Sequence, residues 1–115
     1  MAITNTKVVD TIDKAVIKSI GIGNEGNQLV VNAETLFGST NESLVSMIEC
    51  YFLIEGTGTL KFHAGTETKD LSLTGKGKYG LRPDQLKFGN DKQILLTTDS
   101  NVKSYLLVTE FRRNN

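Results

Sequence analysis

The last third of the chain carries two apolar runs that the hydrophobic pattern predicts to be adjacent strands. Residues 93–98 and 104–112 are rich in aliphatic, threonine and aromatic residues, and the polar residues 99–101 between them have turn chemistry. The simplest interpretation is a β-hairpin that ends the chain. The second run is apolar on both faces, with Leu106 on one side and Leu107 on the other. This two-sided pattern predicts a central strand around which other strands are arranged.

A second long run, residues 44–54, is also apolar on both faces and predicts another central strand. Shorter strands are predicted at residues 14–20, 28–32, 59–64 and 70–74. For the first of these the alternative is a short amphipathic helix starting at Asp10, because apolar residues there recur three and four apart. One helical turn is expected within residues 33–43, followed by a loop.

Turn signals separate these short strands at intervals of eight to twelve residues, which is typical of a β-sandwich or a β-barrel. The 115 residues predict one domain, 1–115, with a core that needs no disulfide. Residues 1–7 are polar and unpatterned, so we expect a flexible N-terminal arm. Residues 75–80 and 81–85 are expected to form a long, glycine-containing basic connection.

The charge balance gives no general attraction to a polyanion. Thirteen basic and thirteen acidic residues leave a formal net charge of zero, so we expect neither nucleic acid nor a membrane surface as a partner. We expect neither a signal peptide nor a membrane span, because residues 1–7 lack an apolar core and no apolar run is long enough to cross a bilayer. The single cysteine, Cys50, lies in an apolar run and is expected to be a buried thiol.

Motifs that resemble catalytic or cofactor sites lack the context that their chemistry needs. Residues 21–26 match G-x-G-x-x-G, but the following segment reads as a strand, whereas dinucleotide binding needs a helix there. His63 is the only histidine and is expected on the solvated face of a strand, which excludes a histidine-based metal cluster. We therefore expect no enzyme activity and no cofactor. An enzyme would have to gather His63 and two acidic groups in one pocket.

A basic and aromatic cluster is the candidate partner-binding site. Lys76, Lys78, Tyr79 and Arg82 fall in the predicted connection, where the cations can contact an acidic protein surface. Tyr79 is the tyrosine predicted to lie in a loop, so it is also the candidate aromatic platform for a sugar.

The order of these segments resembles a family of small virion proteins of tailed bacteriophages. The matching segments run through nearly the whole chain: residues 8–18, 29–36, 47–49, 60–65, 75–81, 94–98 and 106–112. They are structural patterns and contain no catalytic signature.

The resemblance implies an antiparallel, jelly-roll-like β-sandwich that decorates or cements the phage capsid. On this basis the partners are the major capsid protein or other virion proteins, and the protein is located in the virion after assembly in the host cytoplasm. Decoration proteins of this kind are often trimers, so a homo-oligomer, with a trimer favoured, is expected. The alternative function is a carbohydrate-binding β-sandwich module on a phage tail or host-contact structure.

Overall fold

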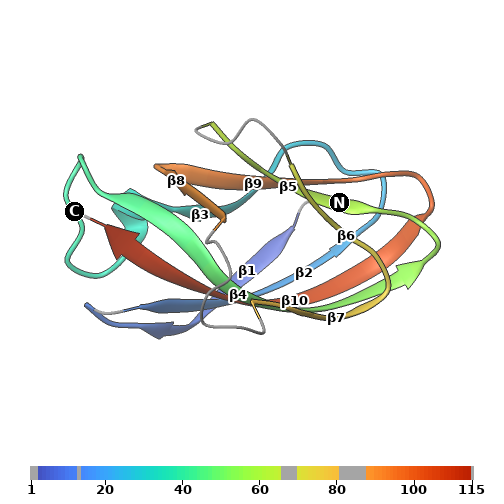
Figure 1. The fold of residues 1–115 in the computed structure, drawn as a ribbon, viewed down its shortest axis with the longest axis horizontal. Coiled ribbons are helices and arrows are strands. Elements are labelled where there is room, and N and C mark those ends of the chain that lie inside the picture. Colours follow the sequence, from blue (N-terminus) through green and yellow to red (C-terminus); the bar gives the residue numbers. More distant parts are fainter. Residues whose placement is uncertain (1–2, 13, 66–69, 81–87, 115) are drawn as a thin grey trace.

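The chain forms two antiparallel β-sheets that face each other in a computed structural model (Figure 1). The structure describes residues 3–12, 14–65, 70–80 and 88–114. In spatial order, the larger sheet contains β1 (Thr4–Asp10), β2 (Ala15–Ile22), β10 (Val102–Asn114), β4 (Leu44–Gly56) and β7 (Lys76–Tyr79), and β8 (Phe88–Asp91) also pairs with β4. The smaller sheet contains β3 (Gln28–Asn32), β9 (Gln93–Thr98), β5 (Leu60–Ala64) and β6 (Leu71–Leu73). A single 3₁₀ turn, η1 (Ala33–Thr35), follows β3.

The connectivity is that of a jelly roll. Four strands in the order β2-β10-β4-β7 face four strands in the order β3-β9-β5-β6. Apart from β1–β2, β5–β6 and β7–β8, each connection between successive strands crosses from one sheet to the other. Two such four-stranded sheets, formed by strands that alternate between them, define the double-sheet jelly roll. The predicted fold class, an antiparallel jelly-roll-like β-sandwich, is confirmed.

Inward-facing apolar side chains fill the space between the sheets. The largest of those that are fully buried are Met47, Leu60, Phe62, Ile94, Leu96, Leu107 and Phe111. Strands β4 and β10 are central, as predicted, since β10 lies between β2 and β4. The helical alternative near Asp10 is wrong, because Ala15, Ile17 and Ser19 alternate into the core from strand β2.

The predicted hairpin of the two last strands is also wrong. Strand β9 pairs with β3 and β5 in the smaller sheet, whereas β10 pairs with β2 and β4 in the larger one. The turn between them therefore carries the chain from one sheet to the other. Asp99 fixes this turn, because its carboxylate accepts the backbone N–H groups of Asn101 at 2.9 Å and Thr59 at 3.0 Å. Residues 99–101 were correctly predicted to form a turn, but a turn sequence does not specify which strands pair.

The N-terminal segment is a strand rather than a flexible arm over residues 4–7. It pairs with β2 as the first part of β1, which forms one edge of the larger sheet. The side chain of Asn5 donates from Nδ2 to the carbonyl of Leu29 at 2.7 Å and accepts from Ser19 Oγ at 2.7 Å. The bond to Leu29 ties β1 to β3, the edge strand of the other sheet, and the bond to Ser19 ties it to β2. Residues 1 and 2 lie outside the described residues.

The part of the chain that the structure describes contains no helix long and apolar enough to cross a membrane.

Candidate functional site

The predicted basic cluster does not form a loop tip. Lys76, Lys78 and Tyr79 belong to β7, which pairs with β4, and Arg82 lies outside the described residues. Lys76 and Lys78 face solvent on the larger sheet, whereas Tyr79 is half-buried and packs against the core. The cluster is therefore split between two faces of the sheet. Because Tyr79 points inward, it cannot be the sugar platform that the sequence suggested.

Lys78 contacts two residues of the neighbouring strand. Its Nζ lies 3.5 Å from Glu49 Oε1 and 4.9 Å from the centre of the Tyr51 ring. A hydrogen bond with Tyr51, together with the Glu49 carboxylate, raises the pKa of Lys78 above its ordinary value. The amine is therefore a fixed positive charge beside an exposed aromatic ring.

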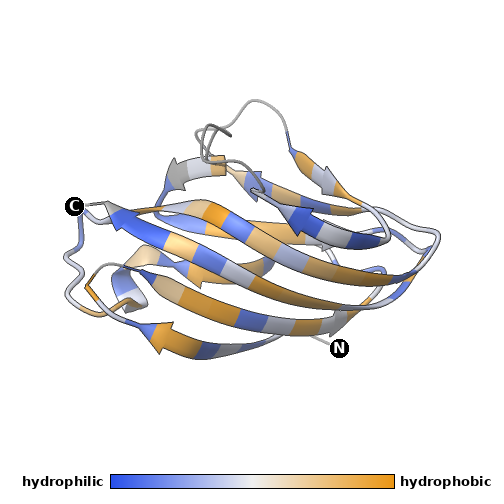
Figure 2. Cartoon of the chain, turned by 60° about the horizontal axis from the view of Figure 1, so that its bottom comes forward, coloured by the Kyte–Doolittle hydropathy of each residue, from blue (hydrophilic) through white to orange (hydrophobic). Residues whose placement is uncertain are grey.

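An apolar band crosses the outer face of the larger sheet. We define it by Ile20 on β2, Leu106 and Val108 on β10, and Tyr51 and Leu53 on β4. The strand register places Leu106 directly between Ile20 and Leu53, and Val108 beside Tyr51. Figure 2, in which this sheet comes forward, shows hydrophobic positions recurring along its strands.

Much of this band is in contact with solvent. The exposed fractions are 48% for Ile20, 52% for Tyr51 and 40% for Leu53. A hollow of about 290 Å³ lies over the band, and Lys18 and Glu55 form part of its lining. An apolar centre with charged residues at its rim is the usual anatomy of a protein–protein interface. The two-sided apolar pattern of β4 and β10 was the sequence signal for this face, although only one side is covered within the chain.

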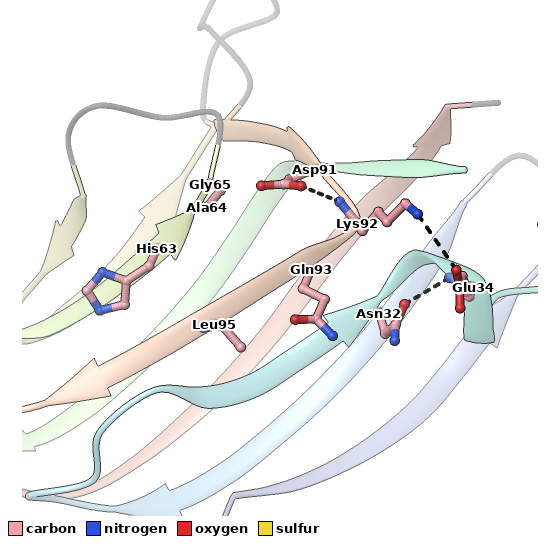
Figure 3. A pocket seen from close by; sticks show the side chains of 9 residues that line it. All are labelled: Asn32, Glu34, His63, Ala64, Gly65, Asp91, Lys92, Gln93 and Leu95. Carbon is pink, nitrogen blue, oxygen red and sulfur yellow. Dashed lines mark hydrogen bonds and ion pairs between the residues drawn. The ribbon is translucent and has the colours of Figure 1, made fainter. Parts of the chain in front are cut away.

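A second candidate site is a shallow polar pocket on the outer face of the smaller sheet (Figure 3). Its volume is about 560 Å³, and its lining residues are Asn32, Glu34, His63, Ala64, Gly65, Asp91, Lys92, Gln93 and Leu95. These residues come from segments far apart in the sequence, and the register brings them together by pairing Asn32 with Gln93 and His63 with Leu95. Sequence reasoning missed this pocket, because no local motif joins the four strands β3, β5, β8 and β9 that line it.

His63 lies on the outer face of β5, as predicted, and is held there between two side chains that the sequence did not indicate. Its Nδ1 lies 2.9 Å from Asp70 Oδ1, and its Nε2 lies 2.9 Å from Thr97 Oγ1. The same hydroxyl accepts the backbone N–H of Asn27 at 3.0 Å. An acid, an imidazole and a hydroxyl in a line is also the order found in serine hydrolases. Here the hydroxyl is engaged on both sides, and the three groups tie β5 and β9 to the residue that precedes β6.

Cys50 is a buried thiol, as predicted. Its side chain is fully buried, and Thr109 Oγ1 on the neighbouring strand lies 3.5 Å from Sγ. Burial raises the pKa of the Cys50 thiol to about 11. Since the thiolate is the reactive form, this residue is poorly suited to nucleophilic chemistry. Among the described residues, no three His, Cys, Asp or Glu side chains are grouped so that they could hold a metal ion.

Comparison with known protein families and with curated proteins finds no match. Among solved structures, the chain is similar to a cupin domain from Bordetella pertussis Tohama I, with a TM-score of 0.47 and 9% sequence identity. The similarity covers 99% of this chain and 95% of the cupin domain.

Proposed function

We propose that this chain is a non-enzymatic structural protein of a tailed-bacteriophage virion, which decorates or cements the capsid through protein–protein contacts. The observation that carries the proposal is the apolar band on the larger sheet. Proteins that remain alone in solution rarely leave a contiguous apolar surface over the central strands of a sheet, because covering it is favourable. The resemblance of the segment order to phage virion proteins supplies the context for the partner.

The energetics of the band fit a protein partner. Burying a Leu or Ile side chain completely stabilises by roughly 1.5–3 kcal/mol. Because Ile20 and Leu53 are already about half buried, covering them gains about 1 kcal/mol each, and Tyr51 adds a similar amount. Lys18 and Glu55 at the rim offer charged contacts that set orientation more than affinity.

The fold suits this role without specifying it. Double-sheet jelly rolls occur in viral capsid proteins, lectins and cupins, so function has to be argued from the site rather than from the architecture. The band spans three strands and is partly hollowed, which offers a broad contact to the major capsid protein or to a second copy of this chain. A trimer remains the oligomer that the phage resemblance favours.

Quantitative mass spectrometry of purified virions tests the proposal. Particles of the phage that encodes the chain are expected to contain hundreds of copies, in a fixed ratio to the major capsid protein. A few dozen copies or fewer would indicate that the protein is part of the tail or the connector. Its absence from purified particles would refute a virion role.

A further inference from the structure

The polar pocket on the smaller sheet has a lining suited to a particular class of ligand. Gln93 lies between His63 and Asn32 in the pocket (Figure 3), and its amide makes no hydrogen bond with other described residues. Asn32 Oδ1 accepts the backbone N–H of Glu34 at 3.1 Å, which leaves the side-chain NH₂ group of Asn32 free to donate to a ligand. Two neighbouring amides therefore present both donors and acceptors to one space.

The shape of the pocket follows from a missing side chain. The register places Gly65 beside Gln93 on the outer face, since Ala64 pairs with Ile94. A Cβ atom at Gly65 would lie 2.4 Å from Asp91 Oδ2, so the carboxylate of Asp91 occupies the space that a larger residue would fill. Its other oxygen, Oδ1, accepts the backbone N–H of Lys92 at 2.7 Å. Asp91 Oδ2 is thus a further acceptor at the edge of the hollow.

Each basic side chain of the pocket, Lys92 and His63, already has an acidic partner. Lys92 Nζ lies 4.0 Å from Glu34 Oε1, and His63 faces Asp70. Within the described lining no cation is left over to neutralise a phosphate or a carboxylate. The remaining groups are amides and one carboxylate oxygen above the apolar side chain of Leu95.

We propose that this pocket binds a neutral sugar, as the terminal residue of a glycan. Adjacent sugar hydroxyls need a donor and an acceptor side by side, which Asn32, Gln93 and Asp91 provide. The apolar face of a sugar ring can then lie against Leu95 and the imidazole of His63, whose two nitrogens are already engaged. This assignment is independent of the virion proposal, because it uses the other sheet.

The pocket is open, so a single copy binds weakly. A dissociation constant on the order of 1 mM is expected for one site, and display of many copies on one particle raises the apparent affinity by roughly 10²–10⁴.

The experiment is an NMR titration of the ¹⁵N-labelled protein with glucose, galactose, mannose and N-acetylglucosamine, together with a glycan array probed by streptavidin-tetramerised protein. Shifts for at least one sugar are expected at the backbone amides of Gly65, Gln93 and Leu95. The Asn32→Ala/Gln93→Ala double variant should lose at least about tenfold in affinity, since it removes both amides that would hydrogen-bond the sugar hydroxyls. Lys61→Ala, on the same strand as His63 but outside the pocket lining, is the matched control and should bind as before.

Thermal unfolding of each variant checks that the fold is intact. The proposal is overturned if no sugar on the array or in the titration binds. It is equally overturned if binding persists in the double variant, or if inorganic phosphate shifts the same amides while neutral sugars do not. None of these outcomes bears on the number of copies in a virion, so the two proposals fail separately.

Discussion

On the proposed function, replacement of Leu53 by lysine should weaken attachment to the capsid at least tenfold while leaving the fold intact. Leu53 is 40% exposed on the β4 side of the apolar band, next to Leu106. Docking would bury that remaining part, which is worth about 1 kcal/mol from a total of roughly 1.5–3 kcal/mol for a whole leucine. A lysine at this position also brings a charge into an apolar contact, and an unpaired charge costs several kcal/mol after relaxation. Since 1.4 kcal/mol corresponds to a factor of ten, the affinity should fall at least tenfold.

Leu29 provides the matched control. It is the same residue type with the same exposed fraction, 40%, but it lies on β3 in the smaller sheet. Leu29→Lys should therefore change attachment by less than about twofold, because a scattered exposed leucine contributes little. The assay is co-sedimentation of each purified variant with particles assembled without the protein, over a range of protein concentrations. The reasoning would be refuted by Leu53→Lys binding like the unsubstituted protein, or by both lysine variants losing affinity equally.

Three further substitutions test the packing of the fold. His63→Leu should lower the free energy of unfolding by about 1–2 kcal/mol, since Asp70 and Thr97 lose a shared partner; an unchanged urea midpoint would mean that this contact adds nothing. Asn5→Ala should cost about 1–3 kcal/mol, because it strips the buried hydroxyl of Ser19 of its acceptor, whereas a flexible N-terminal arm would predict no loss. Because the pKa of Cys50 is raised in the folded protein, its thiol ionises in the unfolded chain at a lower pH than in the folded one. The contribution of this thiol to the free energy of unfolding is therefore intact below pH 9.0 and falls by about 2 kcal/mol by pH 11. Cys50→Ala should lack that part of the alkaline loss, and identical pH profiles for the two proteins would contradict it.

Period-two alternation was sufficient to place most strands. Strand β3 occupies the residues predicted for it, and β2, β4, β5 and β6 lie within a few residues of their predicted bounds. Such patterns report which face of a strand is buried. They do not report the partner strand, which is why β9 and β10 were wrongly joined in a hairpin although each was located correctly.

Strand β7 was missed because it contains glycine, a residue that usually signals a loop. Gly77 faces inward, and a Cβ there would lie 3.2 Å from Cζ of Phe52. A side chain at this position would therefore fit tightly against the Phe52 ring. The sequence therefore predicted a basic connection, and not a strand, over residues 76–79. The polar pocket could not be predicted for a related reason, because its residues meet only once the strand order is known.

The arrangement of the two candidate surfaces has a geometric consequence. The sheets pack face to face through the core, so the outer face of one points away from the outer face of the other (Figure 1). A chain that docks on a particle through Ile20, Tyr51 and Leu53 would therefore leave the pocket of Asn32 and Gln93 directed into solvent. Hundreds of weak sites displayed in this way would act together on a cell surface, where avidity replaces single-site affinity. If both proposals hold, Leu53→Lys should remove glycan binding from particles, because the variant no longer attaches, while the free variant still binds the glycan. The Asn32→Ala/Gln93→Ala variant should remain on the capsid but lose glycan binding both on particles and in free form.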